Sequence, residues 1–205
     1  MVRISQPQPP ARAATGTAAS GTAAGTAAAT TRRSNQFAAV PFRVLYDDRE
    51  RVGGWRFEGL TAGSKKQYRQ LIVDTKEVHL KTGDYTAELP DGTRLPVLIE
   101  RKSGDDLLGS ISGGHQRFRA EHERMREHIY DGWHCCVIVE ASLDDLIDQM
   151  ESPEWTRKAS SELLLGCTAS WPVQYGVPWH FAGDRAAAER LALKVLWKAW
   201  DETKR

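Results

Sequence analysis

Apolar residues recur with two different spacings along residues 43–200, and the two spacings alternate. Short apolar runs bounded by turn residues predict strands around His79 to Thr86 and at residues 95–102, 134–140 and 177–182. Helical spacing predicts helices through residues 117–127, at 143–150, from Ser152 towards Ser170, and after Asp184, where Leu191, Val195 and Ala199 line one face. This order predicts an α/β domain in which helices cover both sides of a sheet.

One predicted hairpin brings carboxylates together. Pro90-Asp91-Gly92-Thr93 is strong turn chemistry between the first two strands. A loop centred on Gly92 places Asp84 opposite Glu100, whereas a two-residue turn pairs Asp84 with Ile99. We favour the odd-length loop, because only that register joins the two carboxylates.

The second strand of this hairpin also carries a lysine on the same face. Side chains alternate along a strand, so Glu100 and Lys102 point one way and Arg101 the other. Two ionised carboxylates repel each other, and a bound divalent cation reverses that penalty. Acidic oxygens beside an ammonium group suit a metal-dependent phosphodiesterase. The alternative is a simple salt bridge among Asp84, Glu100 and Lys102 on an exposed sheet.

The spacing of these residues carries a family resemblance. Gly83-Asp84, Glu100-Arg101-Lys102 and Asp106 reproduce the pattern GD…ERKxxxD, which resembles the nuclease domain of XPF-type structure-specific endonucleases in the PD-(D/E)xK superfamily. The resemblance covers about residues 43–200. It includes a first strand ending in the D-x-R-E element of residues 47–50, a short helix at 107–111, a basic-aromatic pair at 117–118 and a core strand at 135–140.

The resemblance implies a restriction-endonuclease-like fold, a central mixed sheet flanked by helices, that hydrolyses DNA phosphodiesters. It implies Mg²⁺ or Mn²⁺ bound by Asp47, Asp84 and Glu100, with Lys102 orienting or activating the attacking water. Asp106, and also Glu50, would support the metal ligands, and Arg49 and Arg101 would position neighbouring groups or a phosphate. The expected catalytic set is therefore Asp47, Asp84, Glu100, Arg101, Lys102 and Asp106, and the expected substrate is branched or flapped DNA in repair or recombination.

Several of these residues have a purely structural alternative. Ser103 and Asp106 also form an S-x-x-D capping pair at a helix start. Arg101 points away from the carboxylates and could form only a supporting ion pair. The charged run from Arg117 to Glu127 could be a solvated helix face above a buried stripe of Phe118, Met125 and Ile129. The candidate DNA-contacting residues are Arg49, Arg117, Arg119 and His115.

The charge distribution separates a tail from a folded domain. Residues 1–43 hold five arginines and no acid, which leaves 23 basic and 27 acidic residues in the rest. We predict that residues 1–40, rich in Ala, Thr and Gly, are a disordered tail, and that residues 41–205 form the nuclease domain. The tail resembles an organelle transit peptide, although a flexible basic tail or a misassigned start codon is preferred. No apolar run reaches the length of a membrane span.

The remaining features refine the expected partners and location. The three cysteines have neither disulfide nor zinc spacing and favour a reducing compartment, so an intracellular, DNA-associated protein is expected. A group of tryptophans near the C-terminus is interpreted as core or interface rather than as a base-stacking surface. No helix-hairpin-helix pair follows the last predicted helix, so a homodimer or a separate helix-hairpin-helix partner is expected. The alternative functions are a non-catalytic DNA-binding or scaffold module, and a restriction-type nuclease without branch specificity.

Overall fold

The computed structural model describes residues 4–5, 37–50, 53–64 and 67–205. The chain forms two compact units, one from residues 1–40 and 57–73 and one from residues 41–56 and 74–205. The predicted tail of residues 1–40 lies outside the described residues, except for Ile4–Ser5 and the start of a strand at Phe37. That strand, β2 (Phe37–Asp47), continues across the predicted boundary at residue 41.

The described part of the smaller unit is built on a hairpin. β3 (Thr61–Ser64) pairs antiparallel with β4 (Gln67–Val78), and β1 (Ile4–Ser5) pairs antiparallel with β3. Phe57 and Leu60 are buried within this unit, and Leu71 donates its backbone N–H to the carbonyl of Leu60 at 2.7 Å. β4 ends at Val78, in the larger unit.

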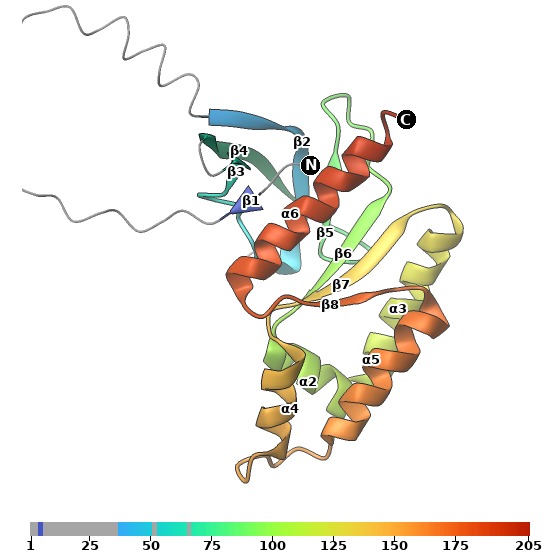
Figure 1. Ribbon diagram of the computed structural model, residues 1–205. Coiled ribbons are helices and arrows are strands. Elements are labelled where there is room, and N and C mark those ends of the chain that lie inside the picture. The colour runs from blue at the N-terminus through green and yellow to red at the C-terminus, as the bar shows by residue number, and fades with distance from the viewer. Residues whose placement is uncertain (1–3, 6–36, 51–52, 65–66) are drawn as a thin grey trace, which may run out of the picture. The chain divides into compact units, whose positions relative to one another are not determined.

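The larger unit contains the mixed sheet that the sequence predicts. Its strands follow the order β2, β5 (Tyr85–Glu88), β6 (Val97–Lys102), β7 (His134–Val139) and β8 (Trp179–Phe181) (Figure 1). β5 pairs antiparallel with β2 and with β6, whereas β7 pairs parallel with both β6 and β8. Residues 97–99 of β6 and 135–139 of β7 are apolar and buried on both faces, because helices cover both sides of the sheet.

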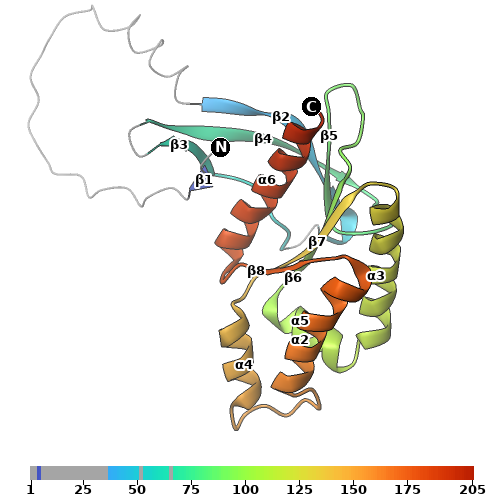
Figure 2. The same cartoon turned by 45° about the vertical axis from the view of Figure 1, so that its right-hand side comes forward.

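Helices lie on both faces of this sheet. One face carries α2 (Gly104–Ser112), α3 (His115–Tyr130), α4 (Leu143–Glu151) and α5 (Ser161–Tyr175), while α6 (Arg185–Glu202) crosses the other (Figure 2). The first face encloses the larger core cluster, in which Leu98 and Val137 of the sheet meet Leu107, Leu164 and Trp171 of the helices. Trp171 and Trp179 are buried there, so the interpretation of these two tryptophans as core is confirmed.

Two details of the predicted elements are wrong. The strand expected around His79 to Thr86 begins only at Tyr85, because Gly83 adopts a left-handed conformation (φ 69°) that breaks an extended chain. The helix expected from Ser152 begins at Ser161, where the hydroxyl of Ser160 accepts the N–H of Leu163. Ser152 instead caps the end of α4, so the same residue served as a stop signal and not as a start.

The buried face of α6 is also displaced from the predicted one. The predicted line of Leu191, Val195 and Ala199 is half-buried. The fully buried residues are Ala188, Ala192, Leu193 and Leu196.

Candidate active site

The hairpin formed by β5 and β6 brings the carboxylates of Asp84 and Glu100 close together. Tyr85 pairs with Ile99, and Asp84 also donates its backbone N–H to the carbonyl of Ile99 at 2.8 Å. Both Asp84 and Tyr85 thus lie against Ile99, and the ladder between β5 and β6 does not include an Asp84–Glu100 pair. The exact register of the two acids stays a prediction, whereas their side chains do line one cavity.

The loop that sets this register has an odd length, but it is not centred on Gly92. Gly92 donates to the carbonyl of Leu89 at 2.9 Å, Leu89 donates to Thr93, and Glu88 bridges Arg94. These bonds centre the three-residue loop on Asp91, with Gly92 in the left-handed region (φ 85°) that such loops require. A short turn at Pro96, closed by Val97 N–H to Leu95 C=O at 2.8 Å, then shifts the pairing to the Tyr85–Ile99 register.

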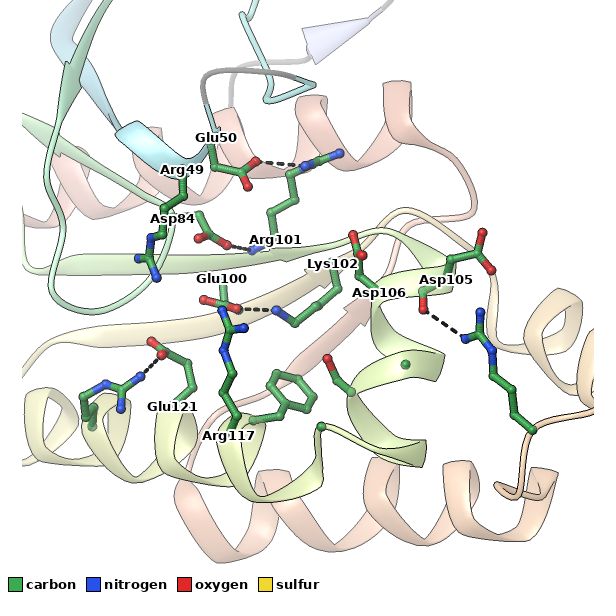
Figure 3. A pocket seen from close by; sticks show the side chains of 16 residues that line it. Arg49, Glu50, Asp84, Glu100, Arg101, Lys102, Asp105, Asp106, Arg117 and Glu121 are labelled. Carbon is green, nitrogen blue, oxygen red and sulfur yellow. Dashed lines mark hydrogen bonds and ion pairs between the residues drawn. The ribbon is translucent and has the colours of Figure 1, made fainter.

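Alternation along β6 separates its three charged residues in the predicted way. Lys102 Nζ lies 2.5 Å from Glu100 Oε1, and it also lies 5.1 Å from the centre of the Phe118 ring. The side chain of Arg101 leaves the strand on the opposite side (Figure 3). The backbone N–H of Arg101 donates to Asp84 Oδ2 at 2.8 Å and so orients that carboxylate.

These residues open into one cavity of about 610 Å³ (Figure 3). Six of its lining side chains are basic and six are acidic, so the cavity is highly polar without a strong net charge. The basic residues are Arg49, Arg101, Lys102, Arg117, Arg124 and Arg157, and the acidic residues are Glu50, Asp84, Glu100, Asp105, Asp106 and Glu121.

The protein environment disfavours the charged forms of the two central carboxylates. Asp84 is 8% exposed and Glu100 is 7% exposed. Burial, and then the charge of Glu100, raise the pKa of Asp84 well above its usual value. Burial also raises the pKa of Glu100, although Lys102 opposes that shift. Burial would lower the pKa of Lys102, but the charges of Glu100 and Asp84 outweigh it and raise the pKa. One ammonium group therefore serves two buried acids.

The third predicted metal ligand, Asp47, lies deeper. Its side chain is fully buried, and its oxygens accept hydrogen bonds from the backbone N–H of Arg49 at 3.0 Å and of Leu80 at 2.6 Å, and from the Arg49 guanidinium. Burial opposes its charge, but these hydrogen bonds lower its pKa overall. Asp47 lies beside Asp84, since its backbone N–H donates to the carbonyl of Asp84 at 2.9 Å, but its side chain does not line the cavity.

Asp47 also belongs to a second group of potential metal ligands. Ligand atoms of Asp47, Asp48 and His79 all lie within 4.8 Å of one another. Asp48 and His79 are exposed, and they lie 3.4 Å apart as an ion pair. The sequence interpretation left Asp48 solvated, which agrees with its exposure.

The remaining predicted catalytic residues have identifiable partners. Arg101 NH1 lies 2.8 Å from Glu50 Oε2, and Arg101 Nε lies 2.9 Å from Glu140 Oε1, so its guanidinium forms the supporting ion pairs named as its alternative. Asp106 donates its N–H to the hydroxyl of Ser103 at 3.1 Å, and its carboxylate accepts that hydroxyl at 2.6 Å. The capping role of Asp106 is thus present, and its side chain also lines the cavity.

The four candidate DNA-contacting residues divide into two pairs. Arg49 and Arg117 line the cavity. Arg119 is exposed and forms an ion pair with Glu123 at 3.2 Å, outside the cavity lining. His115 packs edge-on against Trp171, with ring centres 5.1 Å apart. The geometry thus joins only the first pair to the acidic centre.

Sequence reasoning left four charged cavity residues out of the expected site, namely Asp105, Glu121, Arg124 and Arg157. Glu121 accepts the backbone N–H of Gly83 at 3.0 Å, which ties α3 to the residue before Asp84. Its position could have been predicted from the sequence, because it lies one helical turn after Arg117 on the same helix face. Arg124 follows one turn later and pairs with Glu121. Arg157 lies in the segment between α4 and α5, where the sequence analysis expected a helix, so no local pattern pointed to it.

Comparison with known proteins identifies the family. A model of the ERCC4 domain matches residues 46–193, which is 148 of the 205 residues. The sequence has no match among curated proteins. Two solved structures of XPF from Aeropyrum pernix are similar. The one in complex with DNA has 18% identity and a TM-score of 0.49, and the alignment covers 79% of this chain and 66% of that one.

The second structure of that protein has 20% identity and a TM-score of 0.49, with 80% of this chain and 62% of that chain covered. This chain thus spans about two thirds of the length of these structures. The match of the family model rests on most of the larger unit, including every residue of the GD…ERKxxxD pattern. The resemblance to XPF-type nuclease domains is therefore confirmed, and the chain belongs to the ERCC4 domain family.

Proposed function

We propose that this protein is a divalent-metal-dependent DNA endonuclease, the activity that membership of a nuclease family implies. The observation that carries the proposal is the convergence of Asp84, Glu100 and Lys102 in one polar cavity. A chain that only binds DNA has no need to bury two facing carboxylates beside a single ammonium group, because that arrangement costs stability.

The donor set suits a hard divalent cation. Asp84 and Glu100 would hold Mg²⁺ or Mn²⁺, and Asp47 would complete the acidic set. The raised pKa of Asp84, caused by burial and by Glu100, is the strain that a cation would relieve. When bound, the metal would polarise the scissile phosphate and lower the pKa of a water. Asp47 would join it only by sharing an oxygen that now accepts Arg49 or Leu80.

The other residues prepare the cavity for a phosphodiester. Lys102 would hold the attacking water and balance the negative charge that develops on the phosphate. Its ammonium is fixed between Glu100 and the face of the Phe118 ring, so it needs little reorganisation. Arg49 and Arg117 would bind phosphates on either side of the scissile one, since both line the cavity.

The expected substrate is DNA that is branched or flapped, as in repair or recombination, and the similar XPF structure was solved in complex with DNA. The protein would grip such a substrate as a homodimer or with a separate helix-hairpin-helix partner. None of the described helices has the length and apolar composition needed to cross a bilayer.

A cleavage panel tests the proposal. Labelled single strand, duplex, 3′ flap, 5′ flap and four-way junction are incubated with Mg²⁺, with Mn²⁺ and with a chelator. We expect cutting of branched substrates with either metal and none with the chelator. Asp84→Ala and Lys102→Ala should abolish cutting without unfolding the domain. Binding of every substrate without cutting of any would identify the non-catalytic module, and equal cutting of plain duplex would identify a nuclease without branch specificity.

A further inference from the structure

The face of β6 opposite the catalytic carboxylates is organised around Glu140. Glu140 directly follows β7, and its backbone N–H donates to the carbonyl of Lys102 at 2.8 Å. Its carboxylate is only 7% exposed and accepts both Arg101 Nε at 2.9 Å and Arg101 NH2 at 3.0 Å. This two-point geometry fixes the plane of the guanidinium as well as its position.

Two further donors hold the Glu140 carboxylate itself. Trp55 Nε1 donates to Oε1 at 2.6 Å, and Arg185 NH1 lies 3.2 Å from the same oxygen. Arg185 also donates to the carbonyl of Gly54 at 2.7 Å, so the segment beside Trp55 is held at two points. These contacts hold the Glu140 carboxylate in place independently of Arg101. The carboxylate can therefore fix the position of the Arg101 side chain relative to β6.

Arg101 connects this network to the acids on the other side of β6. Its backbone N–H orients the Asp84 carboxylate at 2.8 Å, and its neighbours along β6 are Glu100 and Lys102. A shift of the Arg101 backbone would therefore displace the donor to Asp84 and both adjacent catalytic groups. A buried charge network of this kind adds little stability compared with apolar packing, but it does hold one geometry.

From this geometry we infer that Glu140 is a positioning residue of the active site, which acts through Arg101 on Asp84, Glu100 and Lys102. The effect of Glu140 on catalysis rests on the proposed nuclease function. The effect of Glu140 on the Arg101 backbone does not depend on that function. The substitution Glu140→Gln removes the charge and presents an amide N–H₂ to donors, while it keeps the size of the side chain.

Three measurements on the full chain test this inference. In Glu140→Gln, hydrogen exchange at the Arg101 amide, followed by NMR, should accelerate at least about tenfold, while the amide of Leu164, buried in α5, should keep its rate. The Mg²⁺ concentration for half-maximal cleavage should rise about 10–100-fold, the usual effect of losing a group that orients metal ligands. The affinity for Mn²⁺ without DNA, measured by calorimetry, should fall by a similar factor.

Glu202→Gln is the matched control, since it makes the same change in an exposed ion pair with Lys198. A double-mutant cycle with Arg101→Lys tests the route: if Glu140 acts through Arg101, Glu140→Gln should add less than about twofold in that background. Unchanged Arg101 exchange and metal affinity in Glu140→Gln would overturn the inference, and so would full additivity in the cycle. If the wild-type chain cuts no DNA, the proposed function fails, whereas the Arg101 exchange rate still decides the positioning role.

Discussion

The two faces of β6 solve the burial of charge in opposite ways. On one face, Arg101 is matched by the carboxylates of Glu50 and Glu140, and each buried charge has a partner. On the other, Asp84 and Glu100 interact with the ammonium of Lys102 and the guanidinium of Arg49, but burial and mutual repulsion still raise the pKa of Asp84. Neighbouring residues of one strand thus separate a fully paired network from a site where burial disfavours the charge of two facing acids.

The largest effect should come from removing the charge of Asp84, one of the two facing acids. Asp84→Asn keeps an oxygen for the Arg101 N–H but loses the negative charge, so the repulsion with Glu100 disappears. We expect the cleavage rate to fall about 10³-fold, since a bound metal contributes several kcal/mol to catalysis.

The same variant should keep or increase its free energy of unfolding, measured by urea denaturation, because the protein no longer buries two facing charges. Asp91→Asn, in the exposed hairpin loop, is the matched control and should change neither quantity. A variant that unfolds more easily than wild type would contradict the contrast between the two faces.

On the face with the fully paired network, removal of the central cation should act on stability. Arg101→Met would leave the carboxylates of Glu50 and Glu140 partly buried without their main partner. We expect a loss of about 3–5 kcal/mol in the free energy of unfolding, the usual result of breaking a buried pair from one side. Arg119→Met, which breaks an exposed ion pair, should cost less than about 1 kcal/mol. Equal losses in both variants would show that the network is not buried in solution.

A buried histidine that packs against Phe118 of the cavity makes the stability of the protein depend on pH. His122 is fully buried under the Phe118 ring, accepts Trp179 Nε1–H at 2.8 Å and lies 2.9 Å from the Phe118 carbonyl, which fits a neutral ring. Burial lowers its pKa to about 4, although the Phe118 carbonyl and Glu121 oppose that shift and Lys102 adds to it. The unfolded chain therefore takes up this proton first as the pH falls.

Between pH of about 6.5 and 4, His122 should therefore make the free energy of unfolding fall by ~1.4 kcal/mol for each unit of acidification. Its contribution above pH of about 6.5 should be nil, because the ring is neutral in both states. The measurement is the slope of stability against pH in wild type and in His122→Gln. The variant should lack this part of the slope, and identical slopes would mean that His122 has the same pKa in the folded and the unfolded chain.

The smallest effect should distinguish the arginines inside the cavity from those beside it. Arg117→Gln should weaken DNA binding several-fold and reduce the salt dependence of log Kd by about one ion, because one phosphate contact is lost. Arg119→Gln, a change of the same kind two residues along α3, should alter affinity less than about twofold, since its side chain lies outside the cavity. Fluorescence anisotropy in Ca²⁺ buffer at several salt concentrations measures the DNA affinity of both variants. Equal losses of affinity would show that DNA does not contact the protein mainly through the cavity.

The sequence predicted what depends on neighbours along the chain. The meeting of the Asp84 and Glu100 carboxylates, the opposite direction of Arg101 and the cap formed by Ser103 all follow from alternation, turn chemistry and short spacing. What it missed depends on contacts between distant segments. Trp55, Glu140 and Arg185 meet only when β7 and α6 are in place, and no local pattern predicts that. The depth of Asp47 is likewise set by Leu80, which a register argument for β5 and β6 does not include.

The hairpin loop has a consequence for how this site can vary. The meeting of Asp84 and Glu100 depends on the number of residues between them, with a three-residue reversal at Asp91 and a further shift at Pro96. Side-chain changes at Asp91 should be tolerated, whereas any side chain at Gly92 would strain its left-handed backbone. The gain or loss of one residue in this loop would turn one carboxylate to the other side of the sheet. The length of an exposed loop thus sets the geometry of the candidate active site.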